Sequence, residues 1–563
     1  MNLIFSWHLV CLTWIIHFIQ ANSLFLHHMV SSLGDVLKIQ GLKVRYPNST
    51  KWILNGFNLK MSSGEKVALV GSSGSGKSTV AKALMQILPS GSLCIGDLTV
   101  DGQNLLQLTN KNLQKIRGES IGLVFQDPMT RLNPLMTVGD HLLDTLRAHH
   151  PKASRSQLKV EADELLNKVG LRPDRFNAYP HEFSGGMRQR VAIALAIALK
   201  PPLIIADEPT SSLDVAVANQ VMSELSFLCD DLGSSLLLIS HDLALASRWC
   251  ERMSILQDGE IVEEGLTKEI LLKPQSFLGQ RLVDATKARE GKKWALKPTS
   301  NIVLEVDRLR CWHAQGGMPW NLNWVKAIDE VNFSLKAGET LGLVGVSGCG
   351  KSTLCRSLVG LLPIRGGEIR LLGQSLGQQS QNDLKKSRQS LQMVFQDPYA
   401  SLNPKMTVSQ NISDPILVHN LLKKSQAKEL SRKLLEQVGL TPPERFQNRM
   451  PYQLSGGQQQ RVAIARALAL KPKVLICDES VSMLDAEIQS EILGLLNSLQ
   501  QNLGLAILFI THDLLLARGF CHRIAVLDKG KIVEEGSADF LFENPSAAIT
   551  KKLIRTCSSI NKV

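Results

Sequence analysis

The sequence predicts an α/β protein of two tandem domains, each built on a mainly parallel sheet, and two observations lead to this prediction. First, five short motifs recur in the same order in the second half of the chain, each about 271 residues after its first copy. Second, short continuous apolar runs alternate with helix-forming stretches, which is typical of a parallel sheet covered on both faces. The repeat therefore divides the 563 residues into two similar units.

The chain is expected to contain five segments. They are an apolar N-terminal extension (1–34), a first domain (35–284), a short basic linker (285–300), a second domain (301–546) and a short basic tail (547–563). The extension has no Lys, Arg, Asp or Glu, is marginal in length for a membrane span, and lacks the basic start of a secretory signal. We favour translation from Met29, with a membrane anchor as the alternative.

The bulk composition is that of globular domains with full cores, at 44% hydrophobic and 20% charged residues. Ten cysteines are scattered without a Cys-x-x-Cys pair, which disfavours zinc ribbons and disulfide scaffolds and suits a reducing compartment. The net charge of +12 indicates an acidic partner surface. Because a basic charge is also common in proteins that work against membranes, we expect no nucleic acid partner.

Each domain opens with strand-like segments, and a later strand in each runs directly into a glycine-rich loop that a helix follows. The order strand, phosphate loop, helix is the context in which this loop binds nucleotide phosphates. The expected strands are 36–40, 42–46 and 64–70 in the first half and 302–306 and 339–344 in the second, and the helices are 80–88 and 354–362.

The glycine-rich loop matches Gly-x-x-x-x-Gly-Lys-Ser in both halves. Its glycines let successive backbone N–H groups turn inward around phosphates, and the helix that follows favours the same anion. The lysine is expected to neutralise the β- and γ-phosphates and the next serine to ligate Mg²⁺. The predicted ATP-binding residues are Gly71, Ser72, Gly74, Ser75, Gly76, Lys77, Ser78 and Thr79, and Gly345, Gly348, Cys349, Gly350, Lys351, Ser352 and Thr353.

An Asp-Glu pair ends a buried apolar strand in each half, after 203–206 and after 474–477. Asp207 and Asp478 are placed to reach the metal through its water shell. The glutamates that follow, Glu208 and Glu479, are candidates to orient and deprotonate the attacking water.

A histidine follows the next buried strand in each half, after 236–239 and after 506–510. We expect His241 and His512 to contact the γ-phosphate, since a lone core histidine would not recur in two nucleotide-binding units. The glutamines of the repeated Val-Phe-Gln-Asp-Pro motif, Gln126 and Gln396, are expected to act in catalysis and metal binding.

A serine and two glycines begin an apolar helix in each half, a pattern that caps the helix and exposes bare backbone donors. These residues are Ser184, Gly185 and Gly186, and Ser455, Gly456 and Gly457. Combined with the motifs above, they resemble the ATP-binding-cassette (ABC) ATPases over residues 35–545. The resemblance implies P-loop NTPase domains, each with an antiparallel β part at its N-terminal end. The helix-rich, more polar stretches near 127–180 and 397–450 predict a helical subdomain in each half.

The resemblance also implies how the two domains share their sites. The Ser-Gly-Gly segment of one domain touches the γ-phosphate bound by the other, so that the domains pair head to tail within one chain. Lys77, Glu208 and His241 would then work with Ser455 and Gly457. Lys351, Glu479 and His512 would work with Ser184 and Gly186.

Further binding residues follow from the same resemblance. Tyr46 and Trp312 stand where the family stacks an aromatic ring on adenine, with a Gly-Gly-Met-Pro-Trp insertion at 316–320 behind the second. Both halves also have an aspartate shortly after the Asp-Glu pair, namely Asp214 in the first and Asp485 in the second. The second copy departs from the first at Ser480 and Met483, which replace Pro209 and Ser212. We expect two competent sites, which need not be equal in rate.

Finer matches resemble the first and second ATPases of oligopeptide and dipeptide importers, fused into one chain. They are Phe-Ser-Gly-Gly-Met-Arg-Gln-Arg in the first half and Leu-Ser-Gly-Gly-Gln-Gln-Gln-Arg in the second. The resemblance implies an ATP- and Mg²⁺-dependent ATPase that powers a membrane importer. It would lie peripherally at the cytoplasmic face of the inner membrane, with two permease subunits and a substrate-binding protein. Nickel, glutathione and peptide-antibiotic importers share these motifs, so the cargo stays open.

The main alternative is a soluble tandem ABC ATPase that acts on ribosomes, which the basic charge favours. Such proteins usually carry a long charged helical linker, whereas this linker has about 16 residues and contains Pro298. The tandem DNA-repair ATPases are excluded because their zinc modules need a different cysteine spacing. The intact Glu208 and Glu479 argue against a non-enzymatic scaffold.

Overall fold

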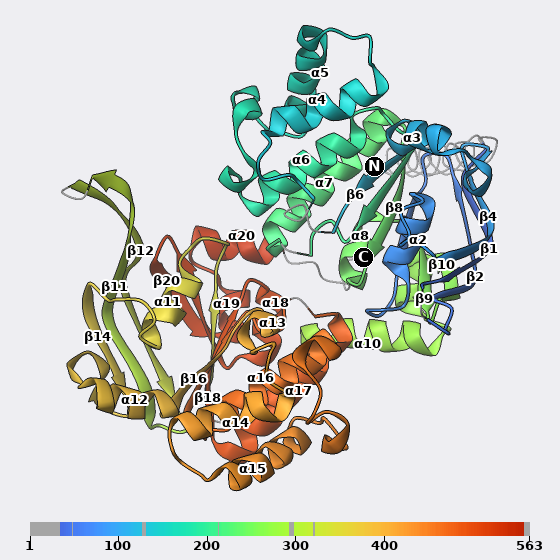
Figure 1. The fold of residues 1–563 in the computed structure, drawn as a ribbon. Helices are drawn as coiled ribbons and strands as arrows, with labels where there is room; N and C mark the ends of the chain where they lie inside the picture. The colour runs from blue at the N-terminus through green and yellow to red at the C-terminus, as the bar shows by residue number, and fades with distance from the viewer. Residues whose placement is uncertain are drawn as a thin grey trace, which may run out of the picture. The chain divides into compact units, whose positions relative to one another are not determined.

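The computed structural model describes residues 34–47, 49–126, 131–211, 213–291, 298–318, 321–482 and 484–556 (Figure 1). The chain divides into two compact units, formed mainly by residues up to Val283 and by residues from Asp284 onward. Almost all of the predicted N-terminal extension, the Ser212/Met483 difference and the end of the tail lie outside the described residues. The start of the predicted linker is helical, because α10 (Phe277–Gly291) continues into it.

The first unit opens with an antiparallel sheet in the order β2-β1-β4-β5. Along β2, alternate residues are buried, among them Phe57, Leu59 and Met61, so one face of the sheet packs on the core. This confirms the antiparallel part that the family resemblance implied. The strands are β1 (Asp35–Arg45), β2 (Leu54–Ser62), β4 (Leu93–Val100) and β5 (Gln103–Asn104).

The second sheet of this unit is mainly parallel, in the order β10-β9-β3-β8-β7-β6, with only β10 antiparallel. Along β3, Val67 and Leu69 face one hydrophobic cluster and Ala68 and Val70 another, so the strand is buried on both faces. That double burial explains the continuous apolar runs. The strands are β3 (Lys66–Val70), β6 (Ile121–Val124), β7 (Leu203–Asp207), β8 (Ser235–Ser240), β9 (Arg252–Gln257) and β10 (Glu260–Leu266).

Helices cover this sheet and form the predicted helical subdomain around α4 and α5. Both helices begin at side-chain caps: Thr137 accepts from the N–H of Asp140, and Ser154 forms a capping box with Gln157. The helices are α2 (Lys77–Leu84), α3 (Asn110–Glu119), α4 (Val138–His149), α5 (Arg155–Lys168), α6 (Gly185–Ile197), α7 (Val215–Leu232), α8 (Leu243–Trp249) and α9 (Thr267–Leu272), with 3₁₀ turns η1 (Leu105–Gln107), η2 (Pro173–Asn177) and η3 (Pro180–Glu182).

The second unit repeats both sheets, in the orders β12-β11-β14-β15 and β16-β17-β18-β13-β19-β20. Its β11–β12 hairpin is longer than β1–β2 and projects from the unit (Figure 1). The strands are β11 (Ile302–Met318), β12 (Asn321–Lys336), β13 (Thr340–Val344), β14 (Gly366–Leu371), β15 (Gln374–Ser375), β16 (Leu391–Val394), β17 (Val474–Asp478), β18 (Ala506–Thr511), β19 (Arg523–Asp528) and β20 (Lys531–Ser537).

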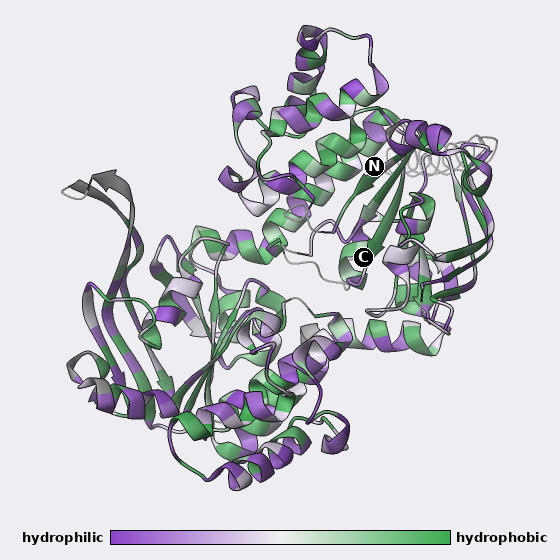
Figure 2. Cartoon of the chain, in the orientation of Figure 1, coloured by the Kyte–Doolittle hydropathy of each residue, from purple (hydrophilic) through white to green (hydrophobic). Residues whose placement is uncertain are grey.

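The helices of the second unit follow the same plan, with α14 and α15 in its helical subdomain. Figure 2 shows hydrophobic strands at the centre of each unit and mixed, partly hydrophilic helices outside. The helices are α11 (Lys351–Leu358), α12 (Gln381–Ser390), α13 (Pro398–Ser401), α14 (Val408–Val418), α15 (Lys424–Gln437), α16 (Gly456–Leu468), α17 (Ala486–Leu503), α18 (Leu514–Phe520), α19 (Ala538–Glu543) and α20 (Ala548–Thr556), with 3₁₀ turns η4 (Leu376–Gln378), η5 (Pro443–Arg445) and η6 (Pro451–Gln453).

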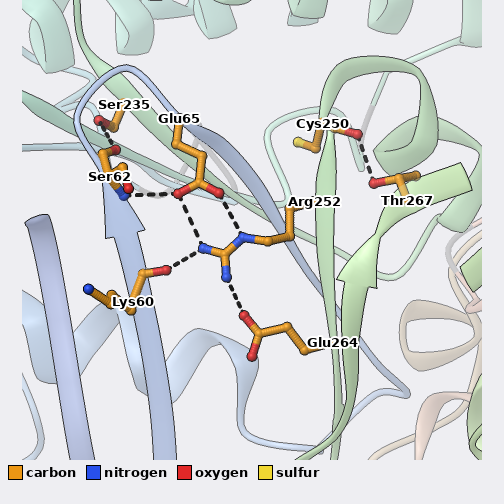
Figure 3. A network of polar contacts seen from close by, with 8 residues as sticks. All are labelled: Lys60, Ser62, Glu65, Ser235, Cys250, Arg252, Glu264 and Thr267. Carbon is orange, nitrogen blue, oxygen red and sulfur yellow. Dashed lines mark hydrogen bonds and ion pairs between the residues drawn. The ribbon is translucent and has the colours of Figure 1, made fainter. Parts of the chain in front are cut away.

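An arginine at the start of β9 joins the two sheets of the first unit (Figure 3). Arg252 Nε lies 2.7 Å from Glu65 Oε1, and its other nitrogens contact Glu264 and the carbonyl oxygen of Lys60. The second unit repeats the arrangement with Arg523, which pairs with Glu339 at 3.0 Å and Glu535 at 2.8 Å. Among the described helices, none is long and apolar enough to cross a membrane.

Candidate active sites

The lysine of each phosphate loop lies across the loop that carries it. Lys77 Nζ donates to the carbonyl oxygens of Gly71 and Ser72, both at 2.8 Å. Lys351 Nζ does the same to Gly345 at 2.8 Å and Val346 at 3.1 Å. Both lysines are buried, so a positive charge is fixed in the centre of each loop, where phosphates would bind.

One glycine of each phosphate loop is required by the backbone geometry. Gly76 has φ 106° and Gly350 has φ 112°, a left-handed conformation that favours glycine. A Cβ on Gly76 would also lie 2.9 Å from Leu54 Cδ2, and one on Gly350 would lie 2.3 Å from the Ala327 carbonyl oxygen. The glycines that precede α2 and α11 therefore cannot carry side chains, as the motif predicted.

In the first site, Glu208 lies between a glutamine and a histidine. Gln126 Nε2 donates to Glu208 Oε2 at 2.6 Å, and His241 Nδ1 lies 3.0 Å from Glu208 Oε1. Ser78 Oγ donates to Asp207 Oδ1 at 3.0 Å. The structure thus brings five residues from four distant motifs to the carboxyl ends of neighbouring parallel strands β7 and β8.

The second site has the same members with looser spacing around its glutamate. Gln396 Nε2 donates to Glu479 Oε2 at 2.9 Å, and His512 Nδ1 lies 3.6 Å from Glu479 Oε1. Lys351 Nζ lies 3.9 Å from the same oxygen. Within the described part of the chain, Asp478 Oδ1 is buried without a hydrogen-bond partner. The two sites are therefore alike in composition but not in their internal contacts.

Both glutamates have a left-handed backbone, which the sequence motifs did not predict. Glu208 has φ 47° and Glu479 φ 44°, an uncommon and strained conformation for a residue with a side chain. A backbone bond to the next strand holds each one, from the Glu208 N–H to Ile239 at 2.9 Å and from the Glu479 N–H to Ile510 at 3.0 Å. In both units this conformation occurs directly after the strand that carries the aspartate, and it sets the direction in which the glutamate carboxylate leaves the backbone.

The electrostatics of the sites keep both glutamates ionised. Burial alone would raise the pKa of Glu208, but the hydrogen bond and charge of His241, with Lys77, lower it below its ordinary value. The pKa of Glu479 is lowered in the same way by His512 and Lys351. An ionised carboxylate beside the phosphate loop can accept a proton from water.

The neighbouring aspartates shift in the opposite direction. Burial raises the pKa of Asp207, opposed by its hydrogen bond from Ser78. Burial and the charge of Glu479 raise the pKa of Asp478 to about 6. A divalent cation would favour the charged forms of both aspartates. The oxygen donors gathered here, with the orphaned Asp478 oxygen, fit Mg²⁺, which prefers oxygen ligands.

The Ser-Gly-Gly segments cap helices α6 and α16 as predicted. Ser184 Oγ accepts from the N–H of Met187, and Ser455 Oγ from the N–H of Gln458, both at 3.4 Å. Both serines are exposed, and each precedes a helix of 13 residues. The second glycine of the first segment has little room for a side chain, since a Cβ on Gly186 would lie 2.5 Å from Val217 Cγ1.

Asp214 and Asp485 lie immediately before helices α7 and α17. Asp485 is the N-cap of α17, because its Oδ1 accepts from the N–H of Ile488 at 2.9 Å. Both carboxylates are largely buried, at 7% and 8% exposed. Their assignment as nucleotide-binding residues stays a prediction.

Strand register places His313, and not Trp312, at the position of Tyr46. Val44 and Cys311 are the matching buried residues, paired with Leu54 and Ile328. Because side chains alternate along a strand, the residue two positions further lies on the same face. That residue is Tyr46 in the first unit and His313 in the second.

Contacts with the phosphate-loop helices agree with this register. Tyr46 Oη lies 2.9 Å from Thr79 Oγ1, and His313 Nε2 lies 3.4 Å from Thr353 Oγ1. Trp312 instead stacks under Lys326, whose Nζ lies 5.1 Å from the ring centroid. The only sequence sign for His313 was its place one residue after an expected aromatic position.

A family profile for the ABC transporter domain matches residues 54–211 and 328–482, together more than half of the chain. The chain belongs to the ABC transporter family. It is 38% identical over 540 residues to the peptidoglycan transport ATP-binding protein YejF of Agrobacterium fabrum, with 94% of this chain and 97% of the relative covered. It is also 38% identical over 558 residues to the glutathione import ATP-binding protein GsiA of Escherichia coli K12, with 92% and 89% covered.

Membership in the ABC transporter family confirms the resemblance drawn from the motifs. The chain carries two ABC ATPase domains and binds ATP. It couples ATP hydrolysis to membrane transport together with membrane permease partners. The relatives span almost the same length with both domains in one chain, so the fused arrangement is shared. Neither relative is a ribosome-associated protein by name, so the translation-factor alternative is not favoured.

Proposed function

We propose that this chain is the double ATPase subunit of an importer of peptides or related small solutes. The names of the two relatives describe peptidoglycan transport and glutathione import, and both match nearly the whole chain. The importer would contain two permease subunits and a substrate-binding protein. The chain would lie peripherally at the cytoplasmic face of the inner membrane.

The geometry around Glu208 carries the catalytic part of this proposal. Its carboxylate is ionised, held by Gln126 on one oxygen and His241 on the other, and set by a strained backbone at the end of β7. Glu208 would accept the proton of the attacking water, while His241 contacts the γ-phosphate. The same arrangement around Glu479 gives the second site its base.

The remaining site residues hold the substrate. Lys77 and Lys351 would neutralise the β- and γ-phosphates from the centre of each loop. Mg²⁺ would be held by Ser78, Gln126 and Asp207 in the first site and by Ser352, Gln396 and Asp478 in the second. When bound, it neutralises charge on the phosphate oxygens. Tyr46 would stack on the adenine of the first ATP, and His313, which has the matching strand position, would stack on the second.

Closure of the two domains over ATP would couple hydrolysis to transport. In this proposal Ser455 and Gly457 complete the first site, and Ser184 and Gly186 complete the second, through the exposed N-termini of α16 and α6. ATP can favour the closed state only by binding it more tightly than the open state, and the added Ser-Gly-Gly contacts supply that difference. Gln126 and Gln396, at the start of the helical subdomains, would pass the change to the permeases.

Co-purification tests the proposed function. The chain is tagged at its C-terminus, and Glu208 and Glu479 are both replaced by Gln to trap the ATP-bound state. The complexes are then isolated from detergent-solubilised membranes and their proteins identified. We expect two multi-spanning permease proteins, whose identity will indicate the cargo. Recovery of ribosomes without a permease would contradict the proposal.

A further inference from the structure

A cavity of about 270 Å³ lies in the second unit, between the end of α11, β14, η4 and α12. Its wall is mostly apolar, and the lining includes Leu358, Leu362, Ile369, Leu371, Leu376 and Leu384. The cavity is separate from the nucleotide site. Helix α11 has eight residues and meets the phosphate loop at its first, Lys351, so about 12 Å of helix separates the loop from the cavity end.

Two small residues in the cavity wall replace large apolar residues of the first unit. Turn η1 and helix α3 match η4 and α12 with the same spacing in the sequence. At the positions of Gly377 and Ser387, the first unit has Leu106 and Ile116. Ile116 is buried there, and Leu106 packs against the same hydrophobic cluster. The second unit has therefore lost two large side chains at the place where its cavity opens.

A cavity with this lining has a defined chemical preference. The cavity is open to solvent on one side, and covering its apolar wall with a hydrocarbon ligand removes that wall from water, which is favourable. Apolar cavities of about 150 Å³ are known to take up ligands as large as benzene. The larger space beside Leu358 and Leu371 can hold a short hydrocarbon chain.

The charged side chain in the cavity wall, Arg388, favours an anion. Arg388 lines the cavity with an exposed guanidinium, which uses Nη2 to donate to the Gly360 carbonyl oxygen at 3.1 Å. Lys385 and Lys386 of the same helix, α12, are not part of the cavity wall, and Lys386 Nζ lies 3.8 Å from Asp383 Oδ1. A guanidinium at the rim can bind a carboxylate through two N–H donors.

We propose that this cavity binds a small amphiphile, a short fatty carboxylate, with its chain among the leucines and its carboxylate at Arg388. Octanoate is the probe, and its binding to the purified full-length chain is measured by calorimetry. We expect saturable binding at one site per chain. The absence of octanoate binding to the wild-type chain would overturn the proposal.

Cavity-filling variants locate the binding site. Gly377→Leu and Ser387→Ile restore large apolar residues like those of the first unit. A Cβ on Gly377 has no heavy atom within 4 Å, so a side chain can start there without a clash. We expect octanoate affinity to fall at least tenfold in Gly377→Leu and further in the double variant. An ATP-induced rise in melting temperature, kept in both, shows that the chain is folded. Unchanged octanoate affinity in folded Gly377→Leu would place the binding elsewhere and overturn the proposal.

The role of the carboxylate is tested separately with octanol, which has the same chain without the charge. We expect octanol to bind the wild-type chain at least fivefold more weakly than octanoate. Arg388→Gln should lower octanoate affinity to that of octanol and leave octanol unaffected. Equal affinities of the two ligands for the wild-type chain would overturn the assignment of an anionic ligand.

Discussion

Glu208 Oε1 lies 3.0 Å from His241 Nδ1, whereas the matching atoms of Glu479 and His512 lie 3.6 Å apart. In the second site the same glutamate oxygen also lies 3.9 Å from Lys351 Nζ. The histidine nitrogen therefore lies closer to the catalytic carboxylate in the first site than in the second. Two copies of one catalytic arrangement have diverged in geometry while keeping every residue type.

Replacing both glutamates with Gln removes the proposed bases while preserving side-chain size. We expect the Glu208→Gln/Glu479→Gln variant to lose ATP hydrolysis by about 10²–10⁴-fold, the usual contribution of a general base. ATP binding should persist, because both phosphate loops are untouched. Hydrolysis is measured as phosphate release and binding as the ATP-induced rise in melting temperature. The exposed Glu543→Gln is the matched control, and hydrolysis at the wild-type rate in the double variant would contradict the assignment.

The residue proposed to stack on adenine differs between the two sites: it is Tyr46 in the first and His313 in the second. With the second site disabled by Lys351→Ala, Tyr46→Ala should weaken ATP binding by about tenfold, since stacking of a base on an aromatic ring is worth about 1–3 kcal/mol. With the first site disabled by Lys77→Ala, His313→Ala should weaken binding in the same direction. Affinities are measured with a fluorescent ATP analogue.

Trp312→Ala is the control for His313→Ala, because the two residues are adjacent but lie on opposite faces of β11. We expect Trp312→Ala to leave ATP affinity within twofold of its parent. A larger loss of ATP affinity in Trp312→Ala than in His313→Ala would show that Trp312, and not His313, stacks on the adenine.

The two sheets, the phosphate loops and the meeting of Asp207, Glu208 and His241 were predictable from the sequence. Asp207, Glu208 and His241 lie at the carboxyl ends of buried parallel strands. The carboxyl ends of neighbouring parallel strands lie at one edge of a sheet. The repeat strengthened each assignment, since a chance motif does not recur at the same step in both halves.

Other features depend on geometry that the sequence does not encode in residue type. The position of His313 depends on the register of β11, whereas the family's preference for an aromatic ring at this position favoured the neighbouring Trp312. A shift of one residue moves a side chain to the other face of a strand. The strained backbone of Glu208 and the cavity beside Gly377 likewise follow from packing, which single motifs do not report.

The arginine that joins the sheets is expected to contribute measurably to the stability of each unit. Arg252→Leu would leave Glu65 and Glu264 without their cationic partner near the start of β9 (Figure 3). Because these groups are only partly exposed, we expect a loss of about 1–3 kcal/mol in the free energy of unfolding. Arg523→Leu should have a similar effect in the second unit. Urea unfolding of each variant checks this, and Arg308→Leu, at an exposed site, is the control.

The carboxylate of Glu534, whose charge can be titrated, holds the segment just before α20, the last described helix of the second unit. Glu534 accepts from the backbone N–H groups of Ser546 at 2.7 Å and Ala547 at 3.0 Å, just before α20. Burial would raise the pKa of Glu534, but these backbone bonds and the one from the Ser546 hydroxyl lower it to about 2. Glu263 makes the same type of contact with Gln275 and Ser276 before α10.

A carboxylate with a lowered pKa stabilises the fold above the pKa of the unfolded chain, about 4.3, and loses that contribution as the pH falls toward about 2. We therefore expect Glu534→Gln to be less stable than the wild type by a constant amount above pH 5, and the difference to shrink between pH 4 and pH 2. Exchange of the Ser546 and Ala547 amide protons, measured by mass spectrometry on a C-terminal peptide, reports this locally. A difference that does not change over that range would show that the Glu534 charge does not hold the helix.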